Sequence, residues 1–274
     1  MKYLGFKATT SGERLFQHLL QNIIEARRAT ELTDLSILQT GGRAEQFSEY
    51  FLGTYTFNLM ARCVKKASRI KESCEDETLH QPTLVKYFQQ SLGMADHPTE
   101  RKLDRLATLT FNASDSSGKK ISDATKRSVR NNKNDHYCYI CGMQILKAAE
   151  SPDSQIEYEH IWPSSYGGDS SAENLLPACP KCNRLKSDLL LWQDTDIHSF
   201  ILPPVPVEEE WKRIERRVKI AKHRYQIFEV ACTRGLSLKE AAIELGPVNM
   251  HHDSLYANDE DDCVDFFNFS IRNA

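Results

Sequence analysis

Two Cys-x-x-Cys pairs constrain this chain more than any other feature of its sequence. Cys138 and Cys141 form the first pair, Cys179 and Cys182 form the second, and residues 142–178 lie between them. Each pair can present both sulfurs from one tight turn, and four thiolates hold zinc tetrahedrally without leaving a position for water or substrate. Grouping of this kind favours metal over disulfides. The sequence therefore predicts a structural Zn²⁺ that closes the intervening segment into a loop.

The composition argues against a membrane protein and leaves a nucleic-acid partner open. No apolar run approaches the roughly 18 residues that a membrane span requires, so we expect a cytoplasmic protein with no membrane partner. The net charge of −3 neither supports nor excludes binding to a polyanion, because the basic residues are concentrated locally. The cysteines outside the two pairs are interpreted as packing or surface thiols: Cys63, Cys74, Cys232 and Cys263.

Two clusters of basic residues flank the cysteine segment. The first precedes it and comprises Lys119, Lys120, Lys126, Arg127, Arg130 and Lys133. The second follows it and comprises Lys212, Arg213, Arg216, Arg217, Lys219, Lys222 and Arg224. Two interpretations of the second cluster stay open, a solvated helix face and a set of phosphate contacts.

Helical periodicity dominates the chain outside the cysteine segment, so we predict an α+β fold in which most of the chain is helical. An apolar stripe from Leu15 to Ile24 follows Ser11 as its expected cap, and a second stripe repeats every four residues from Phe47 to Cys63. We expect a helical domain over residues 1–111, a basic linker over 112–130, the zinc-bearing module over 131–200, and a helical region with an acidic tail over 201–274.

The C-terminal region is predicted to be helical after the prolines at 203, 204 and 206. Its first helix has apolar positions from Trp211 to Cys232 that alternate steps of three and four. A capping box at Ser237-Leu-Lys-Glu240 begins the next helix. This helix resembles the first helix of a helix-turn-helix, but the acidic residues that follow it would repel DNA, which favours an ordinary capped helix.

Polar residues are expected to converge inside the segment between the two cysteine pairs, residues 142–178, which we call the zinc loop. A short strand ends at Glu159-His160, Pro163 and Gly167-Gly168 predict a turn, and a second strand begins after Asn174. A helix should begin near Asn183, where its free amides would favour a phosphate. The result is a strand, a loop, a strand and a helix.

This segment resembles the HNH family of nucleases, in its zinc-stapled subgroup with a ββα-metal core. The resemblance covers about sixty residues and rests on both cysteine pairs, the string Glu-His-Ile-x-Pro, the Gly-Gly turn, Asn174, and Cys-Asn-x-x-Lys at residues 182–186. Small HNH proteins with added helices also resemble nuclease subunits of bacterial anti-phage systems, in which an ATPase or sensor subunit controls cutting.

The resemblance implies a role for each matching residue. His160 would be the general base, and Asn174 would steady the loop and orient the His160 side chain. Glu159 and Asn183 would bind a catalytic Mg²⁺ or Mn²⁺ ion. Lys186 and Arg184 would contact nucleic acid. Many family members have aspartate in place of Glu159 and histidine in place of Asn183, which leaves the choice of metal open.

The sequence thus predicts a divalent-metal-dependent endonuclease that hydrolyses phosphodiester bonds, with DNA preferred over RNA as its substrate. Two other classes of function compete with it. The protein could be a catalytically silent, zinc-dependent binding module for nucleic acid, or an interaction subunit whose helices dock a larger partner. Replacement of His160 separates these readings, because a nuclease needs this residue and a binding module does not.

Overall fold

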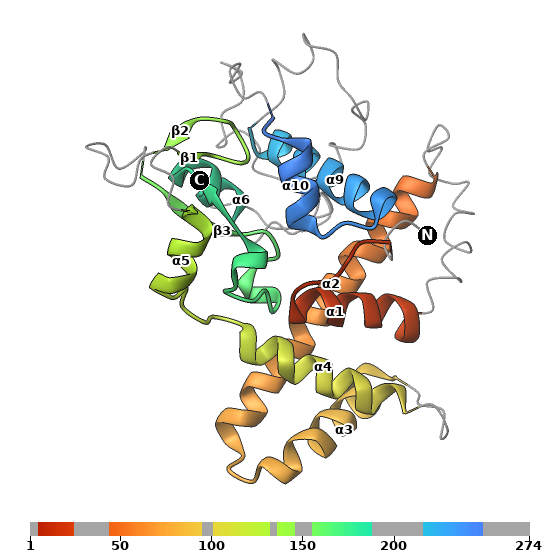
Figure 1. Cartoon of the computed structure of the whole chain (residues 1–274). Coiled ribbons are helices and arrows are strands. Elements are labelled where there is room, and N and C mark those ends of the chain that lie inside the picture. Colours follow the sequence, from red (N-terminus) through yellow and green to blue (C-terminus); the bar gives the residue numbers. More distant parts are fainter. Residues whose placement is uncertain are drawn as a thin grey trace, which may run out of the picture.

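Helices predominate in the fold, and the strands form two small antiparallel sheets (Figure 1), which confirms the predicted α+β class. The computed structural model describes residues 5–24, 44–94, 101–131, 136–145, 155–187 and 216–248. The helices are α1 (Ser11–His18), α2 (Ala44–Ser73), α3 (His80–Leu92), α4 (Lys102–Ser116), α5 (Asp123–Arg130), α6 (Pro180–Lys186), α9 (Arg216–Arg234) and α10 (Leu238–Leu245). The strands are β1 (His136–Tyr137), β2 (Gln144–Ile145), β3 (Glu157–His160) and β4 (Leu175–Ala178).

The N-terminal helices pack around α4, which contacts α1, α2 and α3. The predicted apolar stripe of α1 is buried at Leu15 and Phe16. The helix is capped one residue earlier than predicted: Thr10 Oγ1 accepts from the Glu13 amide, and Glu13 Oε2 accepts from the Thr10 amide at 2.7 Å. Thr10 is the cap because Glu13 stands three residues after it, as a capping box requires.

Much of the segment predicted to be a linker, residues 112–130, is helical. Helix α4 continues to Ser116 because Ala113 and Ser114 are small enough to be buried in its contacts. Helix α5 begins after Ser122, whose Oγ accepts from the Thr125 amide at 3.1 Å, and none of its residues is buried. The division of the chain into four regions stays a prediction.

The C-terminal helices α9 and α10 lie against each other and against the zinc loop (Figure 1). The predicted capping box is present, with Glu240 Oε2 accepting from the Ser237 amide at 2.8 Å. Lys219 and Arg224 of the second basic cluster are buried, so at these positions α9 is not a solvated face. The predicted helix residues from Trp211 to 215 and the acidic tail lie outside the described residues.

One cluster of buried apolar side chains joins the three parts of the fold. It includes Phe16 and Phe57 from the N-terminal helices, Trp162 from the zinc loop, and Ile220 and Phe228 from α9. The Trp162 ring lies edge-on to Phe16, with ring centroids 5.4 Å apart. The zinc loop is therefore packed between the two helical regions. Among the helices that the structure describes, none is long and apolar enough to cross a membrane.

Candidate metal centre and active site

The four paired cysteines come together at one point, as predicted. Their sulfur atoms all lie within 4.8 Å of one another, and Cys141 Sγ is 3.8 Å from Cys179 Sγ. Four thiolates bound at about 2.3 Å to one tetrahedral zinc ion stand about 3.8 Å apart. The site therefore fits a structural zinc ion. Within the described part of the chain, no other group of three or more His, Cys, Asp or Glu side chains is placed to hold a metal.

Two tight turns present the sulfurs. Cys138 follows β1, and its amide donates to the Met143 carbonyl at 2.8 Å across the β1–β2 turn. Cys179 caps α6, and its sulfur accepts from the Cys182 amide at 3.4 Å. Hydrogen bonds among the four thiols lower the pKa of Cys141 and Cys179 and raise the pKa of Cys138 and Cys182. Zinc binds the thiolate form of cysteine, so binding of the ion would release the protons that the cluster shares.

The zinc loop carries the predicted strand, turn and strand, and the predicted helix directly follows it. Strand β3 pairs antiparallel with β4, with Glu157 opposite Ala178 and His160 opposite Leu175. Helix α6 begins at residue 180, three residues before Asn183, because the Cys179 side chain caps it and a proline follows at its first position. His160 thus stands at the end of β3, where the chain enters the turn.

Asn174 ties this turn together. Its Oδ1 accepts from the Trp162 amide at 2.8 Å, and its Nδ2 donates to the carbonyls of Trp162 and Asp169 at 2.9 and 3.0 Å. Gly168 packs so closely that a Cβ atom there would lie 1.9 Å from the Trp162 carbonyl oxygen. The side chain of Asn174 therefore fixes the backbone that directly follows His160.

The His160 side chain is half-buried, and one of its two ring nitrogens has a hydrogen bond to Ser170. Its Nε2 lies 3.0 Å from Ser170 Oγ, and Ser170 Oγ donates to the Lys119 carbonyl at 2.6 Å. A hydroxyl has one proton, so the proton of the His160–Ser170 bond must come from Nε2. In that tautomer Nδ1 keeps its lone pair. Burial, which is the largest effect, and the charge of Lys186 lower the pKa of His160, while Glu159 raises it.

Glu159 and Lys186 form a buried ion pair beneath His160. Lys186 Nζ lies 2.5 Å from Glu159 Oε1, and Tyr139 donates to Glu159 Oε2 at 2.7 Å. The same ammonium donates to the His160 carbonyl at 3.0 Å. Lys186 was expected to contact a phosphate, but its side chain is buried beside Glu159. The reason is that the buried Glu159 carboxylate needs a counter-charge. Ligation of a divalent ion by Glu159 stays a prediction that would require this pair to open.

Asn183 faces a different carboxylate from the one expected. Its Nδ2 donates to Glu157 Oε2 at 2.6 Å, and Arg184 approaches Glu157 Oε1 to 4.0 Å from an exposed position. Side chains two apart on a strand share one face, so Glu157 and Glu159 both face α6. Arg184 is open to solvent, and its contact with nucleic acid stays a prediction.

Sequence reasoning missed three residues of this site. Strand alternation could have found Glu157, because it stands two residues before Glu159. Tyr139 sits inside the first Cys-x-x-Cys pair, but no pattern linked it to Glu159. Ser170 had no local signal, because its hydrogen-bond partner Lys119 belongs to a distant part of the chain.

A cysteine-stapled ββα unit with a histidine at the end of its first strand is the architecture of a zinc-stapled HNH nuclease. Residues 138–189 match the family model described as HNH endonuclease, so the chain contains an HNH endonuclease domain. No curated protein matches the chain, and no solved structure matches it.

Proposed function

We propose that this protein is an endonuclease that hydrolyses phosphodiester bonds of DNA, with His160 as its general base. The HNH domain supports nuclease chemistry. The observation that carries the proposal is the chain of hydrogen bonds from His160 through Ser170 to the Lys119 carbonyl. This chain commits Nε2 to donation and leaves Nδ1 to accept a proton from water.

The proposed reaction is an attack of water on the scissile phosphorus. Nδ1 of His160 takes one proton from the water as the new oxygen–phosphorus bond forms. The bond to the departing oxygen breaks, and that oxygen leaves with the electron pair and takes a proton from solvent. Nε2 keeps its proton and its hydrogen bond to Ser170 throughout, because both neutral and protonated imidazole can donate from this nitrogen. The lowered pKa of His160 keeps the imidazole unprotonated near neutral pH. Lys186 holds the carbonyl of His160, and Asn174 holds the backbone of Trp162, two residues after the base.

A divalent ion, Mg²⁺ or Mn²⁺, is proposed as the catalytic cofactor beside the structural zinc. When bound, such an ion supplies positive charge to the phosphate as negative charge develops on it. Asn183 and Glu157 are adjacent oxygen donors on α6 and β3, and hard cations prefer donors of this kind. Glu159 is the less available ligand, because it is buried against the Lys186 ammonium, whereas Glu157 is partly exposed.

Plasmid cleavage by the His160→Ala protein tests the proposal. The parent should nick or cut supercoiled DNA when Mg²⁺ or Mn²⁺ is added, and the variant should lose at least about 100-fold in rate, the usual contribution of a general base. His80→Ala, on α3, is the matched control and should cut at the parent rate. Equal zinc content and equal unfolding midpoints would exclude misfolding. Equal cleavage by parent and His160→Ala would refute the mechanism, and cleavage of RNA alone would refute the choice of substrate.

An anti-phage role is a separate proposal that follows from the architecture of small HNH proteins with added helices. Cells that express the chain with its natural neighbours, including any ATPase or sensor subunit, should then show fewer phage plaques. The same cells with His160→Ala should lose this protection. Protection that persists in the variant would point to a binding role in place of cleavage.

A further inference from the structure

A basic segment outside the family match lies directly before the nuclease domain. Residues 119–130 carry five cations and one acidic residue, Asp123, and they include all of α5. No residue of α5 is buried. Helices α1 and α4 each bury an apolar face, whereas α5 buries none. The residues of α5 are therefore not explained by packing in the core. We call residues 119–130 the basic arm.

The basic arm lies beside the two-stranded sheet that carries His160. At the start of the arm, the Lys119 carbonyl accepts from Ser170, which contacts the His160 ring. Further along the arm, α5 contacts strand β4, which pairs with β3, and residues 172–174. Burial raises the pKa of Tyr158 on β3, and the nearby charge of Arg130 opposes that rise. Tyr158 and His160 lie two residues apart on β3 and so share one face. The arm consequently runs alongside the catalytic histidine.

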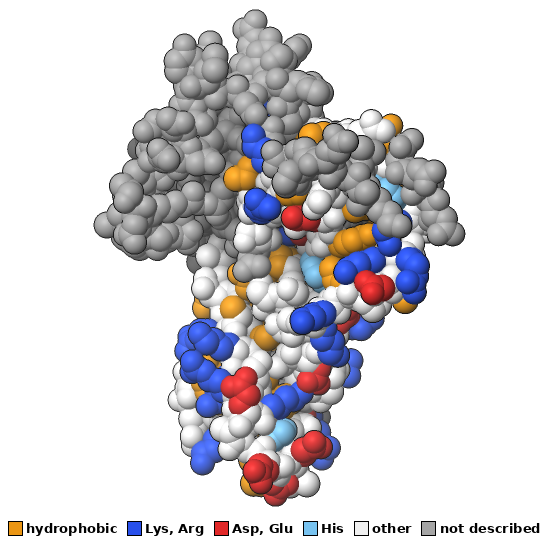
Figure 2. Space-filling model, turned by 90° about the vertical axis from the view of Figure 1, so that its left-hand side faces the viewer, with side chains coloured by type: hydrophobic (Ala, Val, Ile, Leu, Met, Phe, Trp, Pro, Cys, Tyr) orange, Lys and Arg blue, Asp and Glu red, His pale blue; other side chains and the backbone are white. Residues whose placement is uncertain are grey.

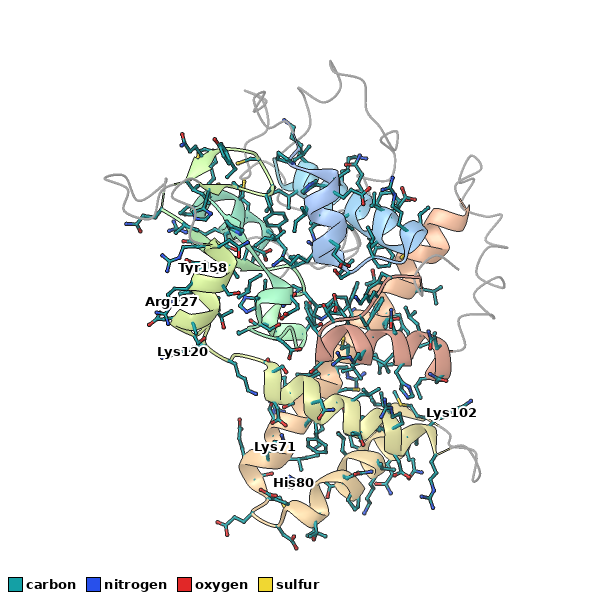
Figure 3. All side chains as sticks on the ribbon, viewed as in Figure 1. Lys71, His80, Lys102, Lys120, Arg127 and Tyr158 are labelled. Carbon is teal, nitrogen blue, oxygen red and sulfur yellow. The ribbon has the colours of Figure 1, made fainter. Side chains whose placement is uncertain are left out.

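Three of the five cations of the arm point toward solvent. Lys119, Lys120 and Arg127 are exposed. Among the described residues, the ion pair within the arm is the one between Lys126 and Asp123, at 3.5 Å and on the surface. Lys120 and Arg127 lie along one side of the molecule together with Tyr158 (Figure 3). Figure 2 views this side face on and shows Lys and Arg side chains gathered at the height of α5.

We propose that the basic arm binds the phosphates of the DNA strand that flank the bond cut at His160. This inference rests on the proposed function and assigns its substrate contacts to residues that precede the HNH match. An α5 of eight residues is about 12 Å long, which spans three to four phosphates at about 3.4 Å each along one strand. Contacts to phosphates carry no sequence information, so the arm binds without sequence preference.

The test measures binding of a labelled DNA duplex by fluorescence anisotropy at several NaCl concentrations. All proteins carry His160→Ala, so that cleavage does not interfere. The arm variant is Lys120→Gln/Arg127→Gln, and the matched control is Lys65→Gln/Arg69→Gln, which removes one exposed lysine and one exposed arginine from α2. Zinc content and the unfolding midpoint are measured for each protein.

The arm variant should lose two phosphate contacts. Each contact adds about 0.9 to the slope of log affinity against log salt, so the slope should fall by about 1.8, and the affinity at 0.1 M salt should fall by about 60-fold. The control should bind as the parent does. An unchanged slope in the arm variant, or an equal loss in the control, would overturn the proposal.

The two proposals fail in different ways. If the protein with His160 intact cuts DNA and the arm variant binds with the parent's slope, the basic arm is refuted and the nuclease stands. If the protein with His160 intact does not cut DNA while the arm variant loses affinity, the nuclease is refuted and the arm is a binding surface alone.

Discussion

Replacing Lys186 by methionine should destabilise the protein strongly, because it leaves the Glu159 carboxylate buried without its cation. Methionine keeps the apolar stem of the lysine and fills most of the same space. What the substitution removes is the ammonium that lies 2.5 Å from Glu159 Oε1 and also donates to the His160 carbonyl. The hydrogen bond from Tyr139 to Glu159 stays in place.

The expected magnitude follows from the burial of the pair. The Lys186 side chain is 0% exposed and that of Glu159 is 3% exposed, so solvent screens neither charge. Removing one partner of such a pair costs about 3–5 kcal/mol, a large part of the roughly 5–15 kcal/mol that stabilises a typical domain. With a urea dependence of about 2–3 kcal/mol per molar, the midpoint of unfolding should fall by roughly 1–2.5 M.

Equilibrium unfolding in urea, followed by circular dichroism with zinc present, measures this change. The double variant Lys186→Met/Glu159→Gln removes both charges and should recover to within about 1–2 kcal/mol of the parent, since no charge is then left unpaired. A loss below about 1 kcal/mol for Lys186→Met would refute the ion pair. Repeating the titrations with Mg²⁺ separates the roles of Glu159, because an ion ligand would give Mg²⁺-dependent stability that Glu159→Gln abolishes.

Three further outcomes are expected. Cys179→Ser should lose its bound zinc and, with it, on the order of 10 kcal/mol of folding free energy. Metal analysis should find one zinc in the control Cys74→Ser, which lies outside the cluster; zinc retained by Cys179→Ser would refute the cluster. The cleavage rate should rise with pH around a midpoint below 6.5 and level off by neutral pH, since burial lowers the pKa of His160; a midpoint above 7 in the profile of kcat/KM would contradict this. Gly168→Ala should lower the unfolding free energy by about 1–3 kcal/mol or more, because the new methyl group meets the Trp162 carbonyl; an unchanged melting temperature would show that the turn is looser than described.

Local patterns were enough to predict most elements of the fold. Helical periodicity located α1 and α2, and the capping box located α10, because capping and amphipathicity act within a few residues. The helix α5 was missed because it buries nothing and so has no apolar period to detect. The burial of Lys219 and Arg224 was missed for the opposite reason, since only the packing of α9 against the zinc loop decides which of its charges meet solvent.

The candidate site divides in the same way. Fixed spacings predicted the cysteine cluster and its position around the ββα unit, because two residues between ligands set the geometry of a zinc turn. The partners of the individual side chains could not be predicted. Lys186 matched a motif position, yet its neighbour Glu159 is buried, and this fact belongs to tertiary packing. Ser170 reaches Lys119 across two regions that the sequence treated as separate.

The packing of Trp162 ties the HNH domain to helices that lie outside the family match. This side chain, two residues after His160, is fully buried against Phe16 and Phe57, and the Gly12 amide donates to the Gly167 carbonyl beside it. A fragment cut at the ends of the family match would expose this large apolar ring to water and release the turn that it anchors. We therefore expect that a fragment must begin near α1, far upstream of the family match that starts at Cys138, to keep His160 in place.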